Sequence, residues 1–129
     1  MADGPTIILL PPAQGGQGVV ANPAIIHDNE TFKIQWVAFN ASQVDSEAFV
    51  DELEILAVPE GCPASDNQDH PLVHSEDASE PPLPAGTKGS LMDPTVGPFA
   101  AGAYLLKVTV DKGRTGTIET NCINIVAAV

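Results

Sequence analysis

The chain has 129 residues and a mass of 13.4 kDa, which fits a single domain with one hydrophobic core. Its 17 acidic residues against 5 basic ones give a net charge of −12, which argues against nucleic acids and anionic membranes as partners, because both select clustered Lys and Arg. A hydrophobic content of 43% excludes disorder of the whole chain, and the apolar runs are far shorter than the roughly 20 residues of a membrane-spanning helix. The start of the chain has no signal-peptide pattern. We therefore expect a soluble protein without membrane insertion or a secretion signal.

The 12 Pro and 11 Gly indicate short elements separated by turns. We interpret residues 1–17 as an N-terminal edge strand or arm, whose strand runs from Thr6 to Leu10 and ends at two prolines. Val19 to Ile26 is an extended stretch interrupted by Pro23. An edge strand can pair with another chain, so the candidate assembly edge is formed by Ile7, Ile8, Leu9 and Leu10.

The clearest strand runs from Thr31 to Phe39, where apolar and polar residues alternate. Trp36, the only Trp, lies on the apolar face and is expected in the core. Val37 and Phe39 are apolar residues on the face where Lys33 and Gln35 are polar. Leu105 is likewise an apolar residue on the polar face of a later strand. Such positions predict a covering segment or a partner.

Residues 45–58 fit two interpretations. The apolar residues from Phe49 to Val58 match one face of a helix, but they also match a strand with Val50, Glu52 and Glu54 pointing outward, which we prefer. Residues 59–86 are rich in Pro and acidic residues and predict a long loop, with at most a short strand from Leu72 to His74.

Three further strands follow, over Thr87–Met92, Ala103–Asp111 and Thr117–Val126. The apolar phase of the last strand changes between Ile118 and Ile123, which predicts a bulge near Glu119 to Asn121. Short strands bounded by turns, without a convincing helix, are typical of an immunoglobulin-like antiparallel β-sandwich. We therefore predict an all-β single domain over residues 1–129, with about seven strands and a long acidic loop.

Several short segments, in this order, resemble those of a known module. They are Asn40-Ala41-Ser42 after a strand, an aromatic-led strand from Phe49, Leu83-Pro84-Ala85-Gly86, Ala101-Gly102-Ala103-Tyr104, Val110-Asp111 and Ile118-Glu119-Thr120-Asn121. Over roughly residues 18 to 127 the chain resembles a CARDB-type domain, the bacterial adhesion-related immunoglobulin-like domain. The residues themselves place Tyr104 where its hydroxyl can bond back to the preceding corner, as in the tyrosine corner of sandwiches.

Cys62 and Cys122 are the only cysteines and lie 60 residues apart. One hypothesis is a disulfide that fixes the long loop to the last strand and adds roughly 4 kcal/mol in the chain-entropy model. The alternative is a reduced pair, with Cys122 as a small core residue.

The long loop also holds candidate metal ligands, which are Asp66, Asp69, His70 and His74. A calcium site built from Asp66, Asn67 and Asp69 is a second hypothesis, although the spacing lacks the glycine and closing glutamate of an EF-hand. The simpler interpretation is a solvated acidic loop, so we expect no cofactor and keep calcium as an alternative.

The chain shows no serine elbow, no oriented nucleophile and no phosphate loop, so we do not expect an enzyme. The preferred hypothesis is a structural or adhesive module that joins protein partners or self-assembles. Examples are a virion capsid decoration protein and a bacterial surface adhesion subunit, located on a virion or an extracellular surface. The alternative is a carbohydrate-binding or calcium-stabilised accessory module, although the long loop contains no aromatic residue for stacking on sugars.

Overall fold

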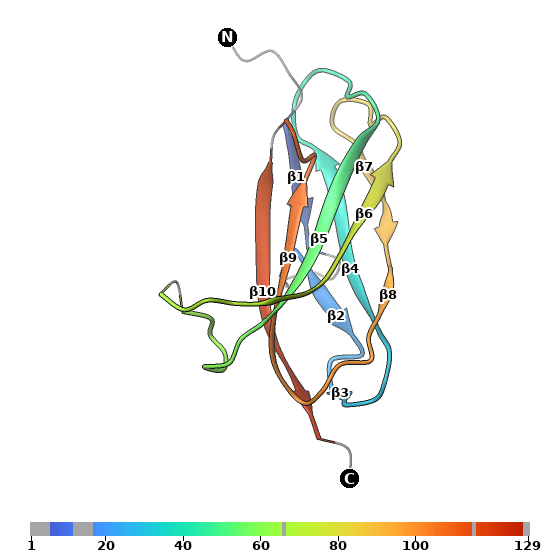
Figure 1. Ribbon diagram of the computed structural model, residues 1–129. Helices are drawn as coiled ribbons and strands as arrows, with labels where there is room; N and C mark the ends of the chain where they lie inside the picture. Colours follow the sequence, from blue (N-terminus) through green and yellow to red (C-terminus); the bar gives the residue numbers. More distant parts are fainter. Residues whose placement is uncertain (1–5, 12–16, 66, 115, 128–129) are drawn as a thin grey trace.

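The computed structural model describes residues 6–11, 17–65, 67–114 and 116–127. These residues form ten strands and no helix, arranged as two packed β-sheets (Figure 1). In chain order the strands are β1 (Ile7–Leu10), β2 (Val20–Asn22), β3 (Ile26–His27), β4 (Phe32–Asn40), β5 (Phe49–Ala57), β6 (Leu72–Glu80), β7 (Lys88–Met92), β8 (Thr95–Val96), β9 (Gly102–Val110) and β10 (Thr117–Val126). The fold is an all-β immunoglobulin-like sandwich, as the sequence predicts.

The first sheet is built around β4. β1 and β7 pair with its C-terminal half, and β2 and β8 pair with its N-terminal half, all antiparallel. Because β4 has neighbours on both sides, its inward residues are fully enclosed. Trp36 is 0% exposed, as expected for the core.

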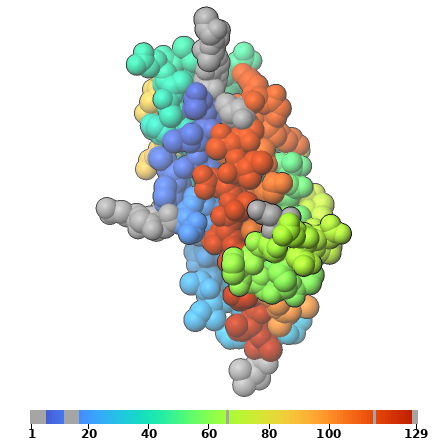
Figure 2. Space-filling model, turned by 90° about the vertical axis from the view of Figure 1, so that its left-hand side faces the viewer, coloured from blue at the N-terminus to red at the C-terminus, as the bar shows by residue number. Residues whose placement is uncertain are grey.

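The second sheet has the order β3-β10-β9-β5-β6. All its pairs are antiparallel except the two-residue contact between β3 and β10. β6 lies at the end of this order and pairs only with β5 in the described part of the chain. In Figure 2, β1 of the first sheet lies beside β10 of the second, and the segment between β5 and β6 projects over the lower part of β10.

The core fills the space between the sheets with alternate residues of the long strands. On β5 the inward residues are Phe49, Asp51, Leu53 and Ile55. Of the two interpretations of residues 45–58, the strand is therefore correct, and it runs from Phe49 to Ala57. A helix would not place every second residue of this segment in the core.

The structure has ten strands rather than about seven, because Pro23 divides the stretch from Val19 to Ile26, β6 lies within the predicted loop, and β8 follows the predicted strand Thr87–Met92. Pro23 separates β2 from β3, and the two pieces join different sheets. Asp93-Pro94 likewise separates β7 from β8. Each proline lacks the N–H that would continue a ladder.

The prediction of one long loop over residues 59–86 is wrong for its central part. β6 is a strand of nine residues that pairs with β5 in regular register from His74 to Glu80, with a register shift between Ile55 and Leu56. Its half-buried or buried positions are His74, Glu76, Ala78 and Glu80. An edge strand with polar residues in these positions shows no apolar alternation, so its sequence resembles that of a loop. The loop proper is residues 58–71, here called the disulfide loop.

The predicted bulge near Glu119 to Asn121 is also wrong. β10 pairs with β9 without a shift from Thr117 to Ile125. The apolar phase changes because Ile118 points outward and is 52% exposed, while Asn121 points inward, where its amide donates to the carbonyl of Val19 at 3.0 Å. The described residues contain no helix that is long and apolar enough to span a membrane.

Candidate functional site

An apolar strip crosses the outer face of the first sheet. Val37 and Phe39 alternate with the inward residues of β4, and cross-strand pairing places Leu10 and Leu91 beside Val37 and Ile8 beside Phe39. The apolar strip is thus formed by Ile8, Leu10, Val37, Phe39 and Leu91. Leu91 is 47% exposed and the other four are half-buried. The sequence predicts a partner or a covering segment here, and the second sheet packs against the opposite, inner face.

The candidate assembly edge, Ile7 to Leu10, is an edge strand that pairs only with β4 in the described part of the chain. Ile7 and Leu9 are buried in the core, whereas Ile8 and Leu10 belong to the apolar strip. Residues 1–5 and 12–16 of the predicted arm lie outside the described residues. Assembly through this edge stays a prediction.

The disulfide loop is bound to β10 through its cysteine. Cys62 and Cys122 form a disulfide with a Cα–Cα distance of 5.7 Å. Cys122 lies on the outer face of the second sheet, opposite Leu105 of β9. Leu105 shares a shallow hollow with the disulfide, Pro63 and Ala64. The outward apolar position at Leu105 is therefore half-buried beside the disulfide loop.

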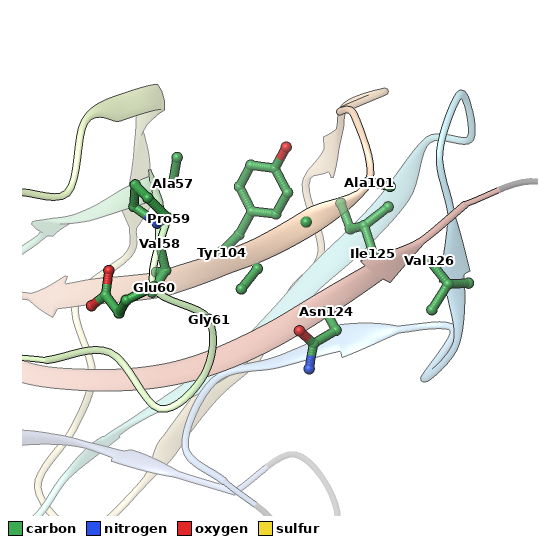
Figure 3. A pocket seen from close by; sticks show the side chains of 12 residues that line it. Ala57, Val58, Pro59, Glu60, Gly61, Ala101, Tyr104, Asn124, Ile125 and Val126 are labelled. Atoms are coloured by element: carbon green, nitrogen blue, oxygen red, sulfur yellow. The ribbon is translucent and has the colours of Figure 1, made fainter.

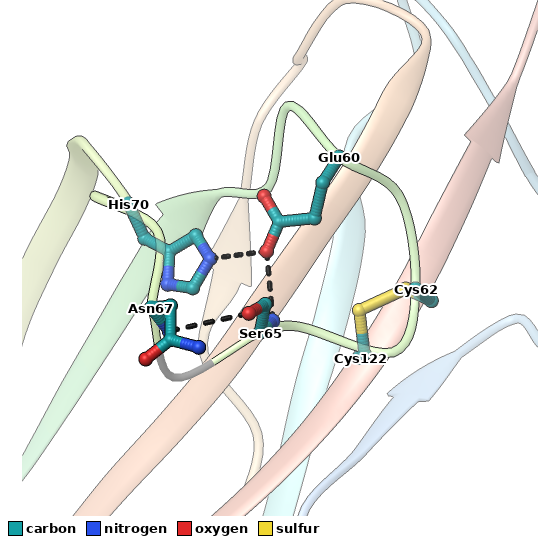
Figure 4. A network of polar contacts seen from close by, with 6 residues as sticks. All are labelled: Glu60, Cys62, Ser65, Asn67, His70 and Cys122. Carbon is teal, nitrogen blue, oxygen red and sulfur yellow. Dashed lines mark hydrogen bonds and ion pairs between the residues drawn. A yellow bond between two sulfur atoms is a disulfide. The ribbon is translucent and has the colours of Figure 1, made fainter.

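A polar network holds the disulfide loop in shape (Figure 4). The Glu60 carboxylate accepts hydrogen bonds from the backbone N–H of Ser65 at 2.8 Å and from the His70 ring at 2.7 Å. These contacts, the Ser65 N–H first and His70 second, lower the pKa of Glu60 to about 2. The backbone N–H of Asn67 donates to the Ser65 hydroxyl at 3.2 Å.

The candidate metal ligands do not converge in the described residues. His70 bonds to Glu60, whereas His74 lies on β6 and bonds to Glu76 at 2.7 Å. No group of three His, Cys, Asp or Glu side chains within the described ranges could hold a metal ion. Asp66 lies outside the described residues, so its part in the proposed calcium site stays a prediction.

Two carboxyl groups are buried together near the only Trp. Asp51 is 0% exposed and accepts hydrogen bonds from the Trp36 indole N–H and from the backbone N–H of Asp111, both at 3.0 Å. Glu80 is 2% exposed, and its carboxyl oxygens make no hydrogen bond of standard geometry to the described residues. Burial, and after it the neighbouring Asp51, raises the pKa of Glu80 to about 9. Glu80 is therefore protonated at neutral pH.

A hollow of about 740 Å³ lies where β9 begins and β10 ends (Figure 3). Its lining is mostly backbone and small side chains, with Tyr104 and Glu60 as the ionisable groups. The Tyr104 hydroxyl donates to the carbonyl of Ala100 at 2.7 Å, which confirms the predicted tyrosine corner. Burial raises the pKa of Tyr104.

The sequence matches no family model and no curated protein. The fold, however, is similar to solved structures. One is a CARDB domain of Pyrococcus furiosus, described in complex with di-metal ions, with a TM-score of 0.60 and 11% identity over 99% of both chains. A β-glucosidase of Listeria innocua, solved with gluconolactone, has a TM-score of 0.59 and 11% identity. An alkylpurine DNA glycosylase of Pseudomonas fluorescens, bound to DNA, has a TM-score of 0.54 and 15% identity.

These similarities define the fold as an immunoglobulin-like sandwich of the CARDB type, as the sequence resemblance implied. The match to the glucosidase covers 97% of this chain but 16% of the glucosidase chain. The match to the glycosylase covers 87% of this chain but 31% of the glycosylase chain. The same fold thus also occurs as part of much longer chains. With identities this low, the similarity concerns the fold.

Sequence reasoning missed the Asp51–Glu80 pair. The signal was present at Asp51, which shares the parity of Phe49, Leu53 and Ile55 and must point inward if they do. A charged residue in an inward phase predicts a buried polar partner. Glu80 gave no comparable signal because β6 itself was not predicted.

Proposed function

We propose that this protein is a non-catalytic immunoglobulin-like module whose copies associate through the apolar strip, as subunits of a larger surface assembly. The observation that carries the proposal is the strip itself. Single exposed apolar side chains are common on protein surfaces, but a contiguous group across three strands is typical of an interaction site.

The contrast between the two outer faces supports this role. At the centre of the second sheet, Glu54 pairs with Lys107 on the neighbouring strand, at 3.7 Å, although Ile118 of β10 is 52% exposed on the same face. On the first sheet, three neighbouring strands present only apolar side chains at the level of Val37. Two copies of the same apolar patch are complementary to each other, as a twofold interface requires.

No observation favours the alternative functions. Each of the six aromatic side chains is buried or half-buried, so none is presented as an open platform for a sugar. A location on a virion or on an extracellular surface remains part of the proposal, and a role in capsid decoration or in bacterial adhesion would be a special case of it.

Sedimentation velocity tests the proposal. The protein is measured from about 10 µM to about 1 mM, the range in which weak association of −4 to −7 kcal/mol becomes visible. Added NaCl screens repulsion between the acidic chains. We expect reversible, concentration-dependent association of the wild type.

Leu91→Lys should abolish this association, because it places a charge in the most exposed part of the apolar strip. Thr95→Lys is the matched control: it adds the same charge to an exposed position of the same sheet without removing an apolar side chain. A wild-type protein that stays monomeric throughout, or equal effects of the two variants, would contradict the proposal.

A further inference from the structure

The outer edge of β6 is a second surface with the properties of a binding site. β6 ends the order of the second sheet and pairs only with β5 in the described residues. It is nine residues long and contains no Pro or Lys, two residue types with which proteins commonly protect such edges. Pro71 and Pro81 lie just outside it, so the accessible edge has defined ends.

The ladder identifies which backbone groups face outward. In antiparallel pairs, the N–H and C=O of one residue point to the same side, and successive residues alternate. The Val50 carbonyl accepts from the Lys112 N–H, on the β9 side. Asp51 and Leu53 are therefore bonded to the β6 side, where they pair with Ala78 and Glu76.

The residues between these partners must direct their N–H and C=O groups away from β5. They are Ser75, Asp77 and Ser79, and all three are exposed. Two of the three have small side chains, which leave the backbone accessible. The edge thus offers a row of unpaired donors and acceptors at the spacing of an added strand.

Charge determines which strand can be added. The hairpin from Phe49 to Glu80 contains nine acidic residues, and the chain has no Lys or Arg between Lys33 and Lys88. Pairing of two β6 edges would bring like charges together, which is unfavourable. A strand with Lys or Arg side chains would instead meet Glu76 on one face and, on the other, Asp77, which already pairs with Lys112 at 2.8 Å.

We propose that the edge of β6 binds an extended, basic segment of a partner protein, which adds to the second sheet as its sixth strand. The inference rests on the proposed function as a protein-binding module, but it uses a different surface from the apolar strip. The two are distinguishable because association through the strip persists in high salt, whereas binding of a basic strand weakens.

The probe is an acetylated, amidated heptapeptide of alternating Lys and Thr, labelled for fluorescence anisotropy. Two control peptides accompany it: one with Glu in place of Lys, and one with N-methyl groups on alternate backbone nitrogens. The N-methylated peptide keeps all the charges but cannot form a ladder. We expect the plain peptide to bind and each control to lose at least about tenfold in affinity, the effect of about 1.4 kcal/mol.

Two variants test the edge itself. Ser75→Pro removes an outward N–H without removing a bond to β5, since proline is tolerated at sheet edges. Asp77→Lys reverses a charge at the centre of the edge, and Glu30→Lys makes the same change at the exposed turn before β4. We expect both β6 variants to lose at least about tenfold in affinity and Glu30→Lys to bind within about twofold of the wild type.

Amide spectra of the protein locate the contact. Peptide addition should shift the N–H signals of Ser75, Asp77 and Ser79, and it should protect them from exchange. The proposal is overturned if the plain peptide does not bind at about 1 mM, if the N-methylated peptide binds equally well, or if the shifts lie elsewhere. Ser75→Pro with a folded spectrum and unchanged affinity would overturn it as well.

Discussion

Replacing Glu80 with Gln should change how the stability of the protein depends on pH. The pKa of Glu80 is about 9 in the folded state, against 4.5 for an exposed glutamate. Between these two values the folded chain keeps a proton that the unfolded chain releases. Stability must therefore fall as pH rises through this window.

The expected slope follows from one proton. Each pH unit lowers the free energy of unfolding by about 1.4 kcal/mol, so the change from pH 6 to pH 8 is at most about 2.7 kcal/mol. Glu80→Gln cannot titrate, and its neutral amide has nearly the same size as the protonated carboxyl group. The variant should lose this part of the slope and be more stable than the wild type at pH 8.

Urea unfolding at pH 6, 7 and 8 and constant ionic strength measures the effect, with the fluorescence of the buried Trp36 as the signal. Glu54→Gln, which makes the same change on the outer face of β5, is the matched control and should keep the wild-type slope. Equal pH dependence of the wild type and Glu80→Gln would refute the assignment of a neutral, buried Glu80.

Three further changes have defined outcomes. Cys62→Ser with Cys122→Ser should lower the free energy of unfolding by about 4 kcal/mol, because the disulfide closes a loop of 60 residues; unchanged urea midpoints would contradict this. Tyr104→Phe should cost about 1 kcal/mol in the same assay by removing the hydroxyl that bonds to Ala100, and a neutral effect would show that the corner is dispensable. The Glu60 carboxyl carbon should titrate by NMR with a midpoint at about 2, so its stabilising contribution is lost as pH falls from 4.5 toward 2; an ordinary midpoint would disprove the network with Ser65.

The sequence predicts the fold class because apolar residues recur at every second position in the long inner strands. The first half of β4 alternates between apolar and polar residues, Trp36 marks its inward face, and Tyr104 identifies the corner before β9. These signals are local, and burial of one face dictates them. For the same reason, the choice of a strand from Phe49 is correct.

Strands at the edges of the sheets are harder to predict from the sequence. β6 shares its backbone bonds with a single neighbour and exposes much of its surface, so polar residues occupy positions where an inner strand would be apolar. The bulge inferred near Asn121 fails for a related reason, since an exposed Ile118 and an inward Asn121 are both stable where a sheet ends. Two-residue strands such as β3 and β8 depend on their partners and leave no periodic signal.

The candidate site was partly accessible to sequence reasoning. Val37 and Phe39 reveal an apolar outer face because they break an alternation. Ile8 and Leu91 join them only through pairing across strands distant in the chain. The pairing of Cys62 with Cys122 likewise depends on where the disulfide loop crosses β10, which the spacing alone does not determine.

Association of copies through the apolar strip is tested most directly by amide correlation spectra of one sample at about 50 µM and about 1 mM, concentrations that bracket a weak dimer. The predicted result is a set of concentration-dependent shifts confined to β1, β4 and β7, centred on Ile8, Val37 and Leu91, and absent in Leu91→Lys. Spectra that do not change with concentration, or shifts that lie on the second sheet, would contradict the proposed function.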